Sequence, residues 1–214
     1  MTISETVMQK LYGANIWEDF SPEPAESEVQ GWNGNAPSLA RIAGIPGPKI
    51  IVDVGVWKGQ STIAMAKAMR DNGIDGVIIA VDTFLGSPEH WADKTLFQRR
   101  NGLPNLYQIF MSNVYNAGVT NYVIPMAQTS STAAKIIGRA GIQASIVHVD
   151  AAHEYREAIQ DIEDYWSLLQ SGGFMIGDDY DVNWPGVIKA AGEFSARIGR
   201  PLTIEWPKFI MQKA

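Results

Sequence analysis

The sequence of 214 residues contains no cysteine and only three histidines. The absence of cysteine excludes disulfide bonds, a thiolate nucleophile and a thiolate metal site. No apolar run approaches the roughly 20 residues that a membrane-spanning helix needs. The N-terminal stretch lacks the basic and apolar regions of a secretion signal. We therefore expect a cytoplasmic protein that has no membrane partner.

Basic residues are also scarce, and they are scattered along the chain. Lys and Arg number 17 against 23 Asp and Glu, which gives a formal net charge of −6 at pH 7. Because nucleic-acid binding depends on clustered cations, this balance argues against a nucleic-acid partner. Hydrophobic residues make up 46% of the chain and charged residues 19%, which is typical of a globular protein. The length favours one domain with an appendage.

From residue 49 onward, short apolar runs alternate with helical patterns. The runs that predict strands are residues 49–54, 76–81, 122–126, 144–149 and 174–177. Helices are predicted over residues 61–70, over 154–169 with Gly172-Gly173 as the stop, and over 184–199. A terminal hairpin is predicted over residues 202–205 and 208–211. This order predicts an α/β fold with a doubly wound, mostly parallel sheet.

Residues 1–48 differ in character from residues 49–214, and we expect them to form an N-terminal cap over the main domain. Residues 21–28 are acidic and rich in proline, which predicts loop or extended chain. Residues 38–43 fit a short helix. The segment is too short to bury a core of its own, so it must pack on the larger domain.

A segment with two glycines, from Asp53 to Ser61, joins the first predicted strand to its helix. Gly55 and Gly59 allow a sharp turn and a close approach of the backbone to a ligand. The helix that follows presents unpaired N–H groups and a positive dipole end, which suit a carboxylate or phosphate. The further glycines of a dinucleotide fingerprint are missing, which argues against NAD. A simple strand-to-helix turn remains the alternative.

A second candidate position is Asp82, which follows the second predicted strand. In nucleoside-binding α/β folds, an acid at this position accepts hydrogen bonds from ribose hydroxyls. A solvated carboxylate at the end of a strand is the alternative. Phe84 follows two residues later and could pack on a base, although an aromatic residue here is as often part of the core.

Three more carboxylates, Asp150, Asp178 and Asp179, follow strands that should be adjacent. They would repel one another in a water-poor cleft, and a hard divalent cation resolves this repulsion. Oxygen ligands favour Mg²⁺ over zinc. His153 lies three residues after Asp150, where a neutral imidazole could take a proton from a substrate hydroxyl. The alternative is a capped helix-start residue, and His148 is interpreted as structural.

Taken together, these motifs resemble class I S-adenosylmethionine-dependent methyltransferases. The similarity rests on segment 53–61, on Asp82, on the pattern Asp150-x-x-His153-x-Tyr155 and on Asp178-Asp179. It is strongest with the metal-dependent small-molecule O-methyltransferase branch, which includes the macrocin and mycinamicin O-methyltransferases and the cephalosporin hydroxylase group. It covers residues 49–180 well and the cap weakly. Several relatives have Glu-Asp where this chain has Asp178-Asp179.

The resemblance implies a Rossmann-like seven-stranded sheet with an antiparallel C-terminal strand, which the terminal hairpin would supply. It implies methyl transfer from S-adenosylmethionine to a hydroxyl of a small molecule such as a sugar or natural product. By position, Asp150, Asp178 and Asp179 would hold Mg²⁺, and Asp150 and His153 would be catalytic, with His153 as the base. The implied cofactor-binding residues are Asp53, Gly55, Gly59, Ser61, Asp82, Thr83, Phe84, Gln128, Thr129 and Ser130.

Two other function classes remain as alternatives. One is a non-catalytic module that binds S-adenosylmethionine or another nucleoside, and the carboxylate and histidine set argues against it. The other is an NAD(P)-linked oxidoreductase, which the missing glycines disfavour. Residues that face the acceptor are expected from the cap and from the loop 87–105. Exposed aromatic residues in the cap would suit a homo-oligomer.

Overall fold

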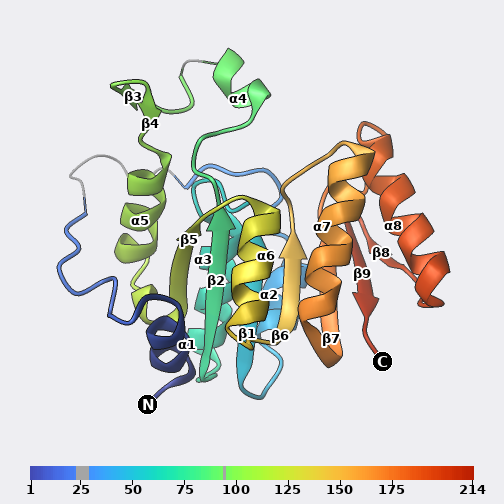
Figure 1. Ribbon diagram of the computed structural model, residues 1–214, viewed down its shortest axis with the longest axis horizontal. Coiled ribbons are helices and arrows are strands. Elements are labelled where there is room, and N and C mark those ends of the chain that lie inside the picture. Colours follow the sequence, from blue (N-terminus) through green and yellow to red (C-terminus); the bar gives the residue numbers. More distant parts are fainter. Residues whose placement is uncertain (23–28, 94) are drawn as a thin grey trace.

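A seven-stranded sheet forms the centre of the computed structural model, which describes residues 1–22, 29–93 and 95–214. Its strand order is β5-β2-β1-β6-β7-β9-β8 (Figure 1). In chain order the strands are β1 (Lys49–Val54), β2 (Gly76–Asp82), β5 (Val123–Ala127), β6 (Ala144–Val149), β7 (Leu169–Gly177), β8 (Thr203–Glu205) and β9 (Lys208–Gln212). A separate hairpin joins β3 (Arg99–Arg100) and β4 (Leu103–Pro104).

The pairing of these strands confirms the predicted fold class. Strands β5, β2, β1, β6 and β7 are parallel neighbours, β9 is antiparallel to β7, and β8 is antiparallel to β9. The chain leaves β1 for β2 on one side and later returns to β6 on the other side. In such sheets, ligands bind beyond the carboxyl ends of the strands at this reversal.

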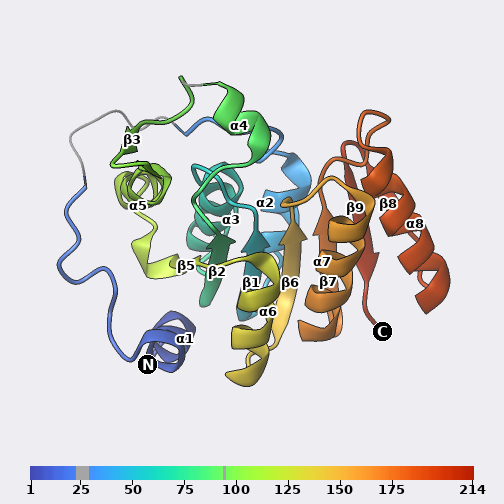
Figure 2. The same ribbon diagram turned by 45° about the horizontal axis from the view of Figure 1, so that its top comes forward.

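Helices cover both faces of the sheet (Figures 1 and 2). One core cluster contains residues of α1 (Ile3–Tyr12), α6 (Ser130–Arg139), α7 (Tyr155–Leu168) and α8 (Pro185–Ile198). The other contains residues of α2 (Pro37–Ala43), α3 (Gln60–Asp71) and α5 (Leu106–Asn116). The short helix α4 (Pro88–Ala92) and the 3-10 turn Thr120–Tyr122 complete the elements of the described ranges. Val52 faces the first cluster and Ile51 the second, which explains why β1 is apolar throughout.

The end of α7 differs from the prediction. The helix stops at Leu168, and Gly172 and Gly173 lie inside β7 instead of ending the helix. Leu169 has extended backbone, so the strand begins at once. Pairing with β6 then skips from Leu169 to Phe174, and Gly172 has a φ of +79°. The two glycines therefore accommodate an irregularity in the strand.

The N-terminal segment contacts the sheet through α1 and through Trp17, among other residues. Val7 and Met8 of α1 join the first core cluster. The Trp17 Nε1 group donates a hydrogen bond of 2.8 Å to the carbonyl of Val123 on β5. The proline-rich loop predicted over 21–28 lies largely outside the described residues. Within the described ranges, no helix is long and apolar enough to cross a membrane.

Candidate active site

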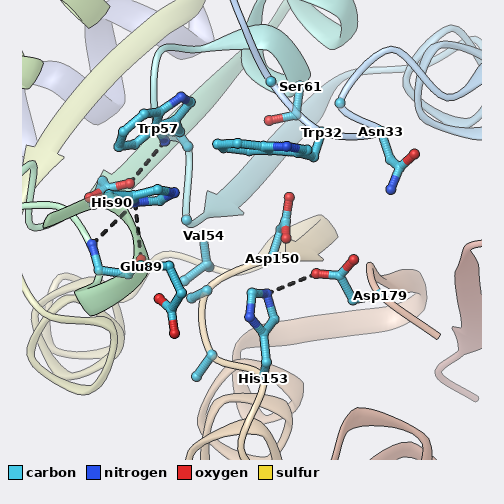
Figure 3. A pocket seen from close by; sticks show the side chains of 18 of the residues that line it. Trp32, Asn33, Val54, Trp57, Ser61, Glu89, His90, Asp150, His153 and Asp179 are labelled. Atoms are coloured by element: carbon cyan, nitrogen blue, oxygen red, sulfur yellow. Dashed lines mark hydrogen bonds and ion pairs between the residues drawn. The ribbon is translucent and has the colours of Figure 1, made fainter. Parts of the chain in front are cut away.

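A cavity of about 1030 Å³ lies beyond the carboxyl ends of β1, β2, β6 and β7 (Figure 3). The predicted site residues that line it are Gly55, Ser61, Asp82, Thr83, Gln128, Ser130, Asp150, His153 and Asp179. The predicted site residues that do not line it are Asp53, Gly59, Phe84, Thr129 and Asp178. The structure thus brings most of the predicted residues to one place. Of the exceptions, Gly59 faces the Phe110 ring and Thr129 is the N-cap of α6.

The close packing of the backbone around position 55 requires a glycine there. Its φ is +86°, and a Cβ atom built on it would lie 1.9 Å from the carbonyl oxygen of Asp150. The two strand ends are tied together because the Asp150 N–H donates to the Val54 carbonyl at 2.8 Å. Glycine at this position therefore lets the first loop of the site pass directly over the end of β6.

Hydrogen-bond partners inside the protein keep the Asp53 carboxylate away from the cavity. Its carboxylate is fully buried and accepts hydrogen bonds from the hydroxyls of Ser61 at 2.9 Å and Thr62 at 2.6 Å. Its other oxygen lies 2.7 Å from Nδ1 of His148, which is also fully buried. Asp53 therefore anchors the start of α3 to β1 and β6.

Asp82 is held at the cavity wall by backbone groups. Its carboxylate accepts hydrogen bonds from the N–H of Trp57 at 2.9 Å and of Phe84 at 2.7 Å. Both donors have positive φ, +50° and +55°, which bends their loops toward the carboxylate. Burial raises the pKa of Asp82, and these backbone hydrogen bonds oppose the rise. The Phe84 side chain instead packs in the core against Phe110.

The predicted set of three carboxylates is divided in the structure. Asp150 and Asp179 line the cavity. Asp178 is buried and forms an ion pair with Lys208, which is also buried. Burial and the nearby charge of Asp178 raise the pKa of Asp150 well above its ordinary value, and Lys208 opposes this. In the described part of the chain, two groups bring ligand atoms within 4.8 Å of one another: His148, Asp150 and Asp178, and Asp150, His153 and Asp179.

His153 forms a pair with Asp179 at the cavity wall (Figure 3). Its Nε2 lies 2.8 Å from Oδ2 of Asp179, and both side chains keep partial access to solvent. The ring packs on Trp184, with the ring centroids 4.1 Å apart. If Nε2 carries the proton that the carboxylate accepts, Nδ1 is the free basic nitrogen. The pair is therefore built like the histidine and carboxylate of an acid–base site.

An aromatic group lies on the opposite wall, and two of its rings come from the cap and the loop 87–105, from which acceptor-facing residues were expected. The rings of Trp32 and His90 stack with centroids 5.4 Å apart, and Trp57 lies 3.9 Å from His90 (Figure 3). Burial is the main cause that lowers the pKa of His90, which favours the neutral form of the ring. Trp32 lies in the N-terminal segment, Trp57 in the loop after β1 and His90 on α4, so the contact between the rings depends on the fold.

Ser130 lines the cavity, but its hydroxyl is already used inside the protein. It donates a hydrogen bond to Asp161 on α7, and the hydroxyl of Tyr165 donates to the Ser130 carbonyl at 2.9 Å. Gln128, two residues earlier, is another predicted adenine-side residue that lines the cavity. Ser130 therefore serves to join the start of α6 to α7.

Asp161 makes the stability of the fold depend on pH. Burial raises the pKa of Asp161 to about 6. Because this value exceeds that of an unfolded aspartate, ionisation above pH 6 destabilises the folded state, and the effect fades as the pH falls toward 4. We expect Asp161→Asn to raise Tm at pH 8 by about 5 °C and to raise it much less at pH 4. Thermal unfolding at both values measures this, and an equal change at the two would contradict it.

Comparison with known proteins identifies the family of this chain. Residues 52–180 match the model of a family described as a methyltransferase domain. No curated protein matches the sequence. The solved O-methyltransferase NovP is 19% identical, with a TM-score of 0.64, and the match covers 99% of this chain and 98% of NovP. An O-methyltransferase from Bacillus cereus in complex with SAH is 18% identical, with a TM-score of 0.58 and coverage of 97% and 88%.

A third solved structure is the O-methyltransferase TomG from Streptomyces achromogenes, described as involved in tomaymycin synthesis and in complex with SAM. It is 14% identical, with a TM-score of 0.58, and the match covers 99% of this chain and 89% of TomG. At such identities the structural matches establish the fold. The family match spans more than half of the sequence and confirms the resemblance to methyltransferases. This chain belongs to the methyltransferase-domain family.

Proposed function

We propose that this protein transfers a methyl group from S-adenosylmethionine to a hydroxyl oxygen of a small molecule. The observation that carries the proposal is that the His153–Asp179 pair shares one cavity with Asp82 and with the loop between β1 and α3, which contains Gly55 and is called the Gly55 loop below. A nucleoside site and a proton acceptor therefore face the same space. At about 1030 Å³, this space is at the upper end of the range for small-molecule sites, which suits a cofactor and an acceptor together.

The residues divide the chemical work between binding and proton transfer. Asp82 accepts hydrogen bonds from the ribose hydroxyls, and its two backbone donors keep it in place. Nδ1 of His153 takes the proton of the acceptor hydroxyl, while Asp179 holds the ring by Nε2 and stabilises the positive charge that forms. The hydroxyl oxygen then attacks the methyl carbon, and the carbon–sulfur bond breaks to leave S-adenosylhomocysteine. Alignment of the two reactants supplies much of the acceleration.

A divalent cation fits the residues at this site. The carboxylates of Asp150 and Asp179 both face the cavity, and their oxygens lie within 4.8 Å of each other and of a His153 nitrogen. Mg²⁺ is commonly held by one or two carboxylates together with water and substrate oxygens. We propose Asp150 and Asp179 as its protein ligands. When bound, the ion would make the acceptor hydroxyl more acidic.

The charge of the cavity restricts the acceptor. Eight carboxylate side chains line it: Asp82, Glu89, Asp93, Asp150, Glu154, Glu157, Asp179 and Asp181. No Lys or Arg is among the described lining residues. Two like charges roughly 10 Å apart in a protein cleft repel by about 1–2 kcal/mol. We therefore propose an uncharged hydroxylated acceptor that packs against Trp32 of the N-terminal segment, and disfavour phosphorylated or nucleotide-linked acceptors.

Calorimetry followed by methyl-transfer assays tests this function. We expect the protein to bind S-adenosylmethionine, and Asp82→Ala to weaken binding by about 10- to 100-fold because ionic hydrogen bonds are lost. Asp71→Ala on the exposed end of α3 is the matched control and should bind normally. Radiolabelled methyl groups should be transferred to a neutral methyl glycoside more readily than to its phosphorylated form.

Three results would contradict parts of this proposal. Binding of NADH without binding of S-adenosylmethionine would overturn the function itself. Binding of the cofactor without transfer to any hydroxylated compound would favour the non-catalytic alternative. Preferred transfer to the phosphorylated glycoside would overturn only the acceptor class.

A further inference from the structure

We propose that Lys208 is an internal cation that withdraws Asp178 from divalent-metal binding, so that the site uses two carboxylates although the sequence offers three. The inference rests on the proposed function in so far as the metal would serve methyl transfer. It concerns residues that lie beneath the cavity, in the buried layer between β6, β7 and β9.

The sheet register brings Lys208 to Asp178. Phe209 of β9 is paired with Gly177 of β7, so the preceding residue of β9 meets the following residue of β7. A Cβ on Gly177 would lie 2.1 Å from the Phe209 ring, so the glycine lets the two strands pack closely here. The hydrogen bond from the Tyr180 N–H to the Pro207 carbonyl, 2.7 Å long, extends this pairing past the end of the strand.

Both oxygens of Asp178 are engaged by the protein. Oδ2 forms the ion pair with the Lys208 ammonium, and Oδ1 accepts a hydrogen bond of 2.8 Å from the N–H of Asp179. The Lys208 and Asp178 side chains are 0% and 1% exposed. A metal ion at this carboxylate would compete with the buried ammonium for the same negative charge, and displacing the ammonium from its carboxylate would be strongly unfavourable.

His148 holds the ammonium from the other side. Its Nε2 lies 3.4 Å from Nζ of Lys208, and its Nδ1 lies 2.7 Å from the Asp53 carboxylate. A protonated Nδ1 that donates to Asp53 leaves the Nε2 lone pair toward Lys208. Four buried side chains thus form one connected network in which Lys208 is placed by two acceptors.

This network accounts for the charge at the strand ends. Oxygens of Asp150 and Asp178 lie within 4.8 Å of each other, and two carboxylates so close in a buried place need a compensating cation. Lys208 supplies that charge from within the chain. Removal of Lys208 should therefore release Asp178 and remove a repelling positive charge, and both changes favour a bound metal ion.

Binding of Mn²⁺, followed by electron paramagnetic resonance, tests the inference. We expect Lys208→Met to bind Mn²⁺ at least about tenfold more tightly than the wild type. The double variant Asp178→Asn/Lys208→Met removes the whole ion pair and should bind within about threefold of the wild type, or more tightly, because Asp178 is not a ligand there. Asp150→Asn is the control that should weaken binding by about tenfold or more.

Two outcomes would overturn the inference. One is a folded Lys208→Met protein whose Mn²⁺ affinity is unchanged or lower. The other is a loss of about tenfold or more in the double variant, which would identify Asp178 as a ligand in the wild type. If Lys208→Met does not fold, the double variant decides alone, since replacing both partners of a buried pair is well tolerated. Titration of the same samples with S-adenosylmethionine tests the proposed function separately.

Discussion

Replacement of His153 with alanine is expected to lower kcat by about 10²- to 10⁴-fold, the usual contribution of a general base. The affinity for S-adenosylmethionine should change by no more than about twofold, because Asp82 and the Gly55 loop are at a different part of the wall. Single-turnover rates and calorimetry on the same preparations measure the two effects. The expected loss is large because, among the described cavity residues, His153 is the histidine that pairs with a carboxylate, that of Asp179.

Asp179→Asn is the companion variant for this prediction. The amide can still hold the His153 ring but cannot stabilise the imidazolium, so we expect a smaller fall in kcat than in His153→Ala. A fully active His153→Ala protein would remove the base from the mechanism. A fully active Asp179→Asn protein would remove Asp179 from both the proposed acid–base pair and the proposed metal site.

The second large effect is expected from Gly55→Ala. The added methyl group would meet the Asp150 carbonyl at 1.9 Å, and alanine would also be strained at a φ of +86°. Left-handed strain of about 1–2 kcal/mol and overpacking of about 1–3 kcal/mol together predict a loss of about 2–5 kcal/mol. For a chain of this size the loss corresponds to a Tm lowered by about 5–20 °C. Differential scanning calorimetry measures it.

Gly73→Ala separates the two causes. Gly73 also has a positive φ, +63°, but no atom lies within 4 Å of its added Cβ. It should lose only the strain, about 1 kcal/mol, and keep its activity. Equal destabilisation by the two variants would mean that the contact between the Gly55 loop and the end of β6 has no energetic importance.

The strands could be predicted closely wherever both faces are buried. The bounds of β1 and β6 agree with the predicted 49–54 and 144–149, because an apolar run between two helical layers ends where burial ends. Helices α5 and α6 were not predicted, although α6 carries a start signal: Thr129 is its N-cap and accepts a hydrogen bond from the Thr132 N–H. Helix α1 carries a clear start signal, since Thr2 and Glu5 form a reciprocal capping box that appears in the sequence as Thr-x-x-Glu.

The site could be predicted in position but only partly in detail. The acids after β2, β6 and β7 were expected to meet because the carboxyl ends of parallel strands share one edge. The turning of Asp53 and Asp178 into the core was not predicted, because it depends on His148 and Lys208, which reach them only through the folded sheet. A sequence pattern shows which acids are near an edge, and a buried partner decides which of them face the cavity.

The stacked rings of Trp32 and His90 lie in the N-terminal segment and on α4, 58 positions apart in the sequence. The proposed catalytic pair, His153 and Asp179, follows strand ends on the facing wall. Under the proposed function, acceptor recognition and reaction therefore lie on separately mutable parts of the molecule. Replacing these two rings with other side chains would then redirect the enzyme to acceptors of a different shape and leave its reactive centre unchanged.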